Sequence, residues 1–212
     1  NSVDLLNYVN NYGKKLTENN RGDFPNLSNI GDSENILMGF ADLEATLQGP
    51  GASFQILENN LDLSGDQEGT LLSNPSESIK INSISLTETN NGELYYAFSE
   101  YEYFVANIFL QRFDQTGFPI SSPVRIVEDF MQDNVVADLA NLDNEGLLVV
   151  FDSESWMGSS VQYSGVNYDG GLLSGWTGMA NLSTFGSNQK FRGMVNMGEL
   201  GFFIIWDDDR NG

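Results

Sequence analysis

Short apolar strands recur along the chain at nearly constant intervals. Four of them end in an aromatic residue and are followed by small or acidic residues: Ile36–Phe40, Leu94–Phe98, Leu147–Phe151 and Phe202–Trp206. Their closing aromatics are 58, 53 and 55 residues apart. This spacing indicates an internal repeat of about 55 residues, which is typical of arrays of small structural units.

Each repeat also contains segments typical of neighbouring antiparallel strands. An alternating segment and an Asn- or Gly-containing turn come before three of the apolar strands, as in Ile79–Leu86. A third strand is predicted at Val105–Phe113 and at Val161–Tyr168, and a shorter fourth at Pro123–Val127 and at Leu172–Trp176. Four antiparallel strands per repeat predict an all-β, β-propeller-like array of blades. A β-sandwich or a solenoid of the same strands is the alternative.

The repeat divides the chain into units around 23–75, 76–130, 131–185 and 186–212. Segment 1–22 precedes them, and its apolar residues recur at helical spacing, which predicts a short helix. The fourth unit contains only its first two predicted strands. We therefore expect three blades and part of a fourth, belonging to a longer chain, because propellers close with at least four complete blades.

Composition and charge exclude several classes of function. The 212 residues include 9 basic and 30 acidic side chains, a net charge of −21, with no His and no Cys. Such a chain offers no basic surface for nucleic acid. It also lacks the residues of histidine-dependent nucleophile systems, disulfides and thiolate metal sites. Apolar runs of at most five residues predict no membrane insertion.

Two motifs resemble the repeats of a known group of proteins. Trp206–Gly212 is similar to the W-x-D-x-R-x-G hairpin, and Phe109–Gly117 to the Q-R-x-D-x-x-G strand, of propeller-type repeats in secreted or cell-surface proteins of Bacteroidetes-type bacteria. The resemblance covers roughly residues 36–212. It implies an extracellular or cell-surface protein, often a substrate of type IX secretion, although the sorting domain of that route is not in this sequence.

A calcium site is predicted from the last turn. Asp207, Asp209 and Asn211 place oxygen ligands at alternate positions, and Gly212 follows at the sixth, as in the first half of a calcium-binding loop. The alternative is a hairpin turn in which Arg210 pairs with an aspartate.

Aromatic and acidic residues follow the apolar strands and predict a binding surface. Aromatic faces next to carboxylates suit sugar rings through stacking and hydrogen bonds. We therefore expect a binding or adhesion module, whose partner is a carbohydrate or another surface protein. The candidate ligand-binding residues are Glu100, Tyr101, Tyr103, Glu154 and Trp156.

Two other functions remain open. A polysaccharide-active hydrolase needs only two suitably spaced carboxylates, for which Glu100, Glu102, Asp152 and Glu154 are candidates. A buried pair among Glu100, Asp152 and Glu154 in which one group has a raised pKa would favour this alternative, and solvent-separated carboxylates would count against it. The other is a structural component of a bacterial surface assembly, which would dock on a larger assembly through a sheet edge at Phe202–Trp206. The binding module ranks above the enzyme on sequence alone.

Overall fold

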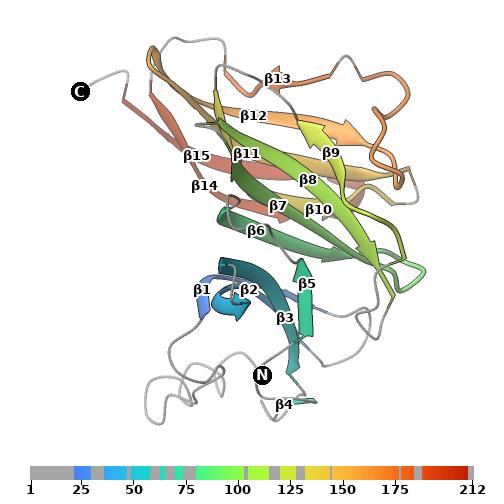
Figure 1. The fold of residues 1–212 in the computed structure, drawn as a ribbon. Coiled ribbons are helices and arrows are strands. Elements are labelled where there is room, and N and C mark those ends of the chain that lie inside the picture. Colours follow the sequence, from blue (N-terminus) through green and yellow to red (C-terminus); the bar gives the residue numbers. More distant parts are fainter. Residues whose placement is uncertain are drawn as a thin grey trace, which may run out of the picture.

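The chain folds into four antiparallel β-sheets, which follow one another in sequence (Figure 1). A computed structural model describes residues 22–29, 36–46, 49–57, 63–64, 70–73, 80–102, 105–114, 120–127, 132–143, 145–176, 178–183 and 188–209. These residues contain no α-helix and therefore no helix that could cross a membrane. The predicted helix in segment 1–22 lies outside the described residues.

Sheets A and B contain the first nine strands. Sheet A has the order β1-β2-β3-β4, with β5 also paired to β3, and sheet B has the order β6-β7-β8-β9. Their bounds are β1 (Gly22–Asn29), β2 (Ile36–Thr46), β3 (Gly49–Leu57), β4 (Leu63–Ser64), β5 (Thr70–Ser73), β6 (Lys80–Glu88), β7 (Leu94–Glu102), β8 (Val105–Phe113) and β9 (Val124–Val127).

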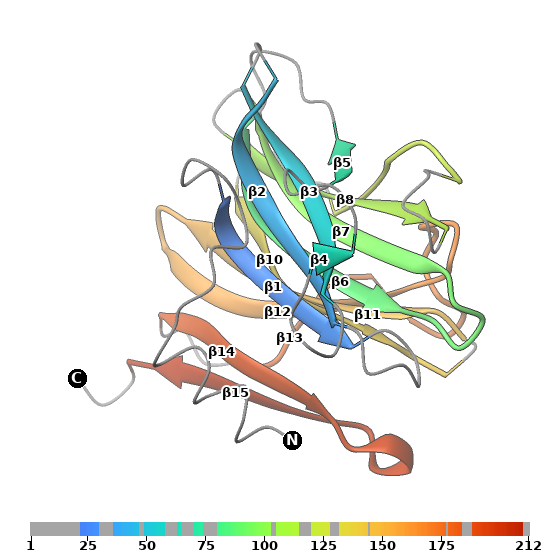
Figure 2. The ribbon, with the colours of Figure 1, turned by 90° about the horizontal axis from the view of Figure 1, so that it is seen from below.

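Sheets C and D contain the remaining strands. Sheet C has the order β10-β11-β12-β13, and sheet D pairs β14 with β15. Within the described residues β15 pairs with β14 alone, and Figure 2 shows this hairpin as a separate layer below the other sheets. The bounds are β10 (Asp133–Asn141), β11 (Leu147–Ser155), β12 (Gly158–Val166), β13 (Ala180–Asn181), β14 (Gln189–Asn196), the 3-10 turn η2 (Gly198–Leu200) and β15 (Phe202–Asp208).

The four aromatic-ended segments lie in four different sheets, and each is the second strand of its sheet. The all-β class and the four-stranded antiparallel sheets are therefore confirmed for sheets B and C. The closing aromatics Phe98 and Phe151 are fully buried, and Trp206 packs against the core of sheet C. Phe98, Phe151 and Trp206 are each the fifth residue of the second strand of its sheet, and the strands continue beyond them.

The sheets pack face to face, and the central strand of sheet C is buried on both sides. The first five residues of β11 are all buried. Alternate residues point to opposite faces of a strand. One face therefore packs against sheet B and the other against the hairpin of sheet D. The sheet B side contains Leu147, Val149 and Phe151 with Tyr95, Ile108 and Leu110, and the sheet D side contains Leu148 and Val150 with Met194, Phe202 and Ile204.

A bulge recurs in the first strand of sheets B, C and D. The pairing with the second strand shifts between Ile81 and Ser83, between Val136 and Asp138, and between Phe191 and Gly193. Each shift inserts one extra residue, and successive bulges are 55 residues apart. Bulges bend a strand and increase its twist. The repeat therefore specifies the curvature of these strands as well as their positions.

The prediction of a fourth strand at Leu172–Trp176 is wrong. Leu172 forms only an isolated bridge to Val166, and the fourth strand of sheet C is β13. The ring of Trp176 instead folds over Gly165 of β12, where a Cβ atom would come within 2.5 Å of the indole. A tight turn, in which the Trp176 N–H donates to the Leu173 carbonyl, makes this placement possible.

Candidate functional site

Acidic residues gather at one edge of sheets B, C and D. The end of each second strand pairs with the start of the first, as in Glu154 with Asp133 and Asp208 with Gln189. Hydrogen bonds between sheets hold these edges together: the Ala106 N–H donates to Asp133 Oδ1 at 3.1 Å. We call this region the acidic edge. Its described charged side chains are Glu100, Asp133, Asp152, Glu154, Lys190, Arg192, Asp207, Asp208 and Asp209.

Asp152 occupies the seam between sheets C and D. It lies on the face of β11 that points to the hairpin of sheet D, and its Oδ1 accepts a hydrogen bond of 2.9 Å from the Phe191 N–H. Burial raises the pKa of this carboxyl, and the charge of Glu154 raises it further. The Phe191 bond and the positive charges of Lys190 and Arg192 act in the opposite direction. Asp152 is therefore a half-buried carboxyl that holds its proton to a higher pH than a free aspartate.

Glu154 is the exposed partner of Asp152. The two residues are two positions apart on β11, so their side chains leave the same face of the strand. Two strand residues span about 6.5 Å. One face of β11 thus presents two carboxyl groups in different environments.

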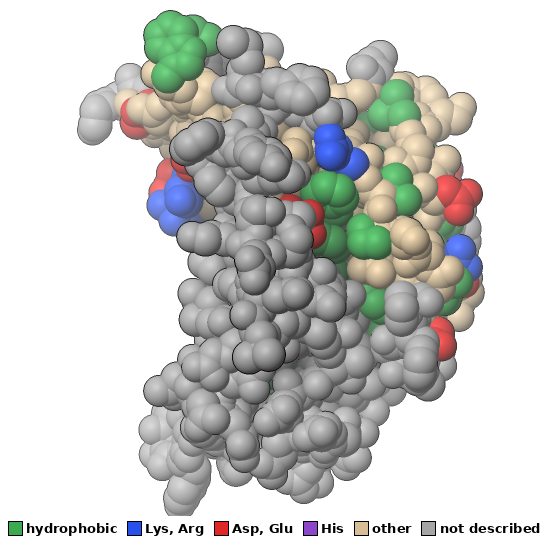
Figure 3. All heavy atoms as spheres, viewed as in Figure 1, with side chains coloured by type: hydrophobic (Ala, Val, Ile, Leu, Met, Phe, Trp, Pro, Cys, Tyr) green, Lys and Arg blue, Asp and Glu red, His purple; other side chains and the backbone are tan. Residues whose placement is uncertain are grey.

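Basic side chains border this pair from β14. Arg192, the bulge residue, donates from Nε to Asp207 Oδ2 at 2.6 Å and forms an ion pair with that carboxylate. Lys190 lies opposite Asp207 in the β14–β15 register. Figure 3 shows acidic and basic side chains side by side at the left-hand end of the described surface, where these strands lie in Figure 1. The site therefore contains cations beside its two carboxyl groups.

Trp156 rises from the same end of sheet C. It lies in the turn between β11 and β12, and 87% of its surface is exposed. The Ser155 hydroxyl holds this turn, since it donates to the Gly158 carbonyl and accepts a bond from the Met157 N–H, both at 3.2 Å. An ordered turn thus presents an aromatic face to solvent next to Glu154.

The structure separates the predicted ligand-binding residues. Glu154 and Trp156 lie together at the end of β11, whereas Glu100 is half-buried on the face of β7 that carries Tyr96 and Phe98. That face points away from sheet C, because Tyr95 and Ala97 of the alternate face form the contact with sheet C. Glu100 therefore belongs to a different seam. Tyr101 lies in β7, and Tyr103 falls outside the described residues.

The predicted calcium ligands have other partners. Asp207 lies in β15, not in a turn, and pairs with Arg192. Asp209 accepts hydrogen bonds from the backbone and side-chain nitrogens of Asn188 at 2.8 and 2.7 Å. Asn211 falls outside the described residues, and the described part of the chain contains no group of three or more metal-binding side chains. Calcium binding stays a prediction.

Sequence reasoning missed the two cations of the site. Lys190 and Arg192 are separated by 36 or more positions from Asp152 and Glu154, and only the packing of sheet D on sheet C brings them together. The available signal was the repeat itself, which aligns the start of β14 with the start of β10.

Comparison with known proteins gives similarity in fold alone. No protein-family model and no curated protein matches the chain. Among solved structures, the chain is similar to an endo-arabinase from Bacteroides thetaiotaomicron, with a TM-score of 0.55 and 13% identity over 91% of this chain and 78% of that one. It is also similar to a glycosyl hydrolase from Bacteroides ovatus, with a TM-score of 0.52 and 10% identity over 88% of this chain and 62% of that one. Arabinanases have a β-propeller fold.

Proposed function

We propose that this chain is part of a β-propeller that hydrolyses a polysaccharide, with Asp152 and Glu154 as its acid–base pair. The observation that carries the proposal is the contrast between these two carboxyl groups on one face of β11. One is half-buried with a raised pKa, and the other is exposed. The similarity in fold to two Bacteroides glycosyl hydrolases supports the same class of substrate. This reverses the ranking made from sequence, which put the binding module first.

The environments of the two groups assign their roles. Glycoside hydrolysis needs a protonated carboxyl to protonate the leaving oxygen and an ionised carboxylate to activate water or attack the sugar. Asp152 suits the first role because burial favours its neutral form. Glu154 suits the second because it is exposed to solvent. Lys190 and Arg192 would orient substrate hydroxyl groups beside the pair.

Trp156 would position the sugar chain. Its exposed indole lies two residues beyond Glu154 and offers an apolar face to the ring of a bound sugar. An aromatic platform at the end of the same strand would place the scissile bond over the carboxyl groups. We also propose that the protein acts outside the cell or at its surface, where such substrates are found, in agreement with the resemblance of its repeats.

A binding module without hydrolysis is the second candidate. The exposed Trp156 beside Glu154 favours it, because a stacking surface needs no acid–base pair. The two candidates differ in what happens to the substrate after it is bound.

Release of reducing ends from a panel that includes linear arabinan tests the proposal. We expect release by the wild type and a decrease of about 10²–10⁴-fold in Asp152→Asn and in Glu154→Gln, the range for loss of an acid–base group. Asp143→Asn and Glu145→Gln are the matched controls, because both carboxylates are exposed at the opposite end of β11. Binding that depends on Trp156 without release would support the binding module instead.

A further inference from the structure

A pocket lies between sheets B and C at the end opposite the acidic edge. It has a volume of about 300 Å³, and the start of β7, the end of β8, the start of β9 and the turn that follows β12 surround it. Tyr95 and Leu110 are buried and form its floor, Arg112 and Tyr168 are half-buried and form its walls, and Ser122 and Asp169 are exposed at its mouth.

A pair of aromatic rings shapes the floor and one wall. The rings of Tyr95 and Tyr168 are 5.3 Å apart between centroids and tilted by 39°. The Tyr168 hydroxyl donates to Asn141 Oδ1 at 2.9 Å, and the Tyr95 hydroxyl donates to Glu93 at 3.2 Å. Both rings are thus fixed at their polar ends, and the pocket has a rigid apolar side.

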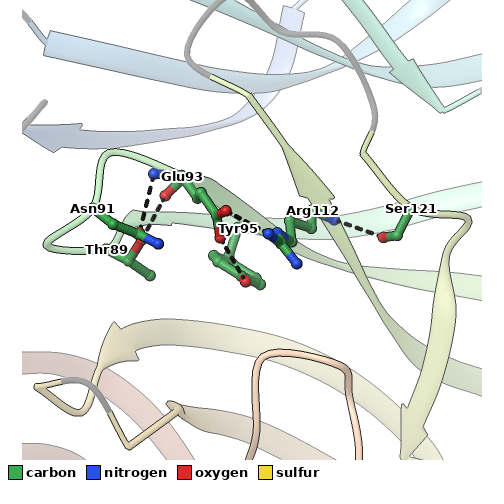
Figure 4. A network of polar contacts seen from close by, with 6 residues as sticks. All are labelled: Thr89, Asn91, Glu93, Tyr95, Arg112 and Ser121. Atoms are coloured by element: carbon green, nitrogen blue, oxygen red, sulfur yellow. Dashed lines mark hydrogen bonds and ion pairs between the residues drawn. The ribbon is translucent and has the colours of Figure 1, made fainter.

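The Arg112 side chain lines this pocket. Its guanidinium pairs with Glu93 through one terminal nitrogen (Figure 4). Its Nε is buried and has no hydrogen-bond partner among the described residues. That nitrogen is closed off from the pocket, so a bound molecule would meet the exposed part of the Arg112 side chain, 30% of whose surface is accessible.

The charges of the pocket select a neutral ligand. Glu93 already balances Arg112, and Asp169 brings a further carboxylate near the guanidinium. Among the residues that line the pocket, an anion would meet the Asp169 carboxylate and a cation would meet the Arg112 guanidinium. A neutral molecule with hydroxyl groups could accept from Arg112, donate to Asp169, exchange hydrogen bonds with the serines at the mouth and place an apolar face against Tyr168.

We infer that this pocket binds one neutral sugar residue, at a site separate from the acidic edge. Its volume is at the lower end of the range of small-molecule sites, so it would accept a single residue or the end of a chain. The choice of a sugar rests in part on the proposed function, whereas the choice of a neutral polyhydroxyl ligand follows from the lining. A second saccharide site would hold the protein on its substrate through two points of contact.

The test follows the Nε–H resonances of the five arginines by NMR during titration with L-arabinose, D-xylose and D-galactose. We expect at least one sugar to shift the Arg112 resonance, with millimolar affinity. Ser122→Trp should weaken this binding at least tenfold by filling the mouth of the pocket. Ser174→Trp, at an exposed turn residue that does not line the pocket, should leave the affinity unchanged.

Asp152→Asn separates this inference from the proposed function. It should slow hydrolysis at least about 100-fold and leave the Arg112 shift intact, so either claim can fail alone. No shift of Arg112 with any of the three sugars would overturn the inference. Equal affinity in Ser122→Trp would also overturn it, as would tighter binding of D-galacturonate or inorganic phosphate than of the neutral sugars.

Discussion

The backbone N–H of Phe191 in sheet D donates to the side chain of Asp152 in sheet C, and this bond repeats one sheet earlier. There the N–H of Val136 donates to the Ser99 hydroxyl at 2.7 Å. The two acceptors are 53 residues apart and the two donors 55. Both donors come directly before a bulge residue, and both acceptors directly follow the closing aromatic of a second strand. The same position thus links neighbouring sheets in both places, and in sheet C the link is a carboxyl.

Removal of the Asp152 side chain should destabilise the protein. In Asp152→Ala the Phe191 N–H loses its acceptor in the seam between sheets C and D, at a cost of about 1–3 kcal/mol. Asp152→Ser introduces the acceptor that sheet B uses and should recover part of this loss. Urea denaturation measures both. An alanine variant as stable as the wild type would show that the bond does not hold the sheets together.

A methyl group at Gly165 should be poorly tolerated. The indole of Trp176 occupies the space where a Cβ atom would lie, so Gly165→Ala should lower the free energy of unfolding by about 1–3 kcal/mol, as overpacking does. The double variant Gly165→Ala/Trp176→Ala should lose less stability than the sum of the losses in the two single variants, because the added methyl group no longer meets the indole. Additive losses in a double-mutant cycle would contradict this contact.

The repeat made much of the fold predictable. The bounds of β8 agree with the predicted third strand, because a run of alternating residues between clear turns has one register in a buried sheet. The fourth strand of sheet C could not be found in this way. That strand, β13, has only two residues, too few to show a pattern. The position of Trp176 depends on its contact with Gly165 of β12, where there is no side chain, and this contact is not visible in the sequence around Trp176.

The site was predictable only within single strands. Glu154 and Trp156 are neighbours in sequence and stayed together, whereas the grouping of Glu100 with them assumed that different second strands present corresponding residues to one surface. Alternation places Glu100 and Glu154 in different seams. The pairing of Arg192 with Asp207 depends on the bulge in β14, which no local sequence pattern specifies.

Asp138 should make stability depend on pH. Its carboxyl is half-buried on β10, accepts bonds from the Ser85 hydroxyl and the Leu139 N–H, and has a pKa that burial raises above 3.8. The folded state therefore binds the proton more tightly than the unfolded state, and stability falls as pH rises through the interval between the two pKa values.

Asp138→Asn should remove this contribution. The wild type should lose stability between pH 3 and pH 7 through Asp138, and the variant should not. The stability of the variant minus that of the wild type should therefore be larger at pH 7 than at pH 3, as measured by thermal unfolding. Glu145→Gln, at an exposed carboxylate, is the control. A difference between Asp138→Asn and wild type that does not vary with pH would contradict the assignment.

Trp156→Ala should separate binding from folding. The side chain is 87% exposed, so its removal should change the free energy of unfolding by less than about 0.5 kcal/mol. Its loss should weaken polysaccharide binding in affinity electrophoresis. Trp176→Ala is the opposite control, because that ring is packed on sheet C and its loss should lower stability. Unchanged retardation of Trp156→Ala would remove this residue from the site.

The most direct test of the account compares wild type and Asp152→Asn for both binding and cleavage of the same polysaccharide. The amide oxygen that this substitution introduces can still accept the hydrogen bond from the Phe191 N–H. The amide has no acidic proton, however, and cannot transfer one to a leaving oxygen. We predict that the variant binds as the wild type does and releases reducing ends at least about 100-fold more slowly. Equal rates in the two proteins, or no cleavage by the wild type of any polysaccharide that it binds, would contradict the acid–base pair on β11.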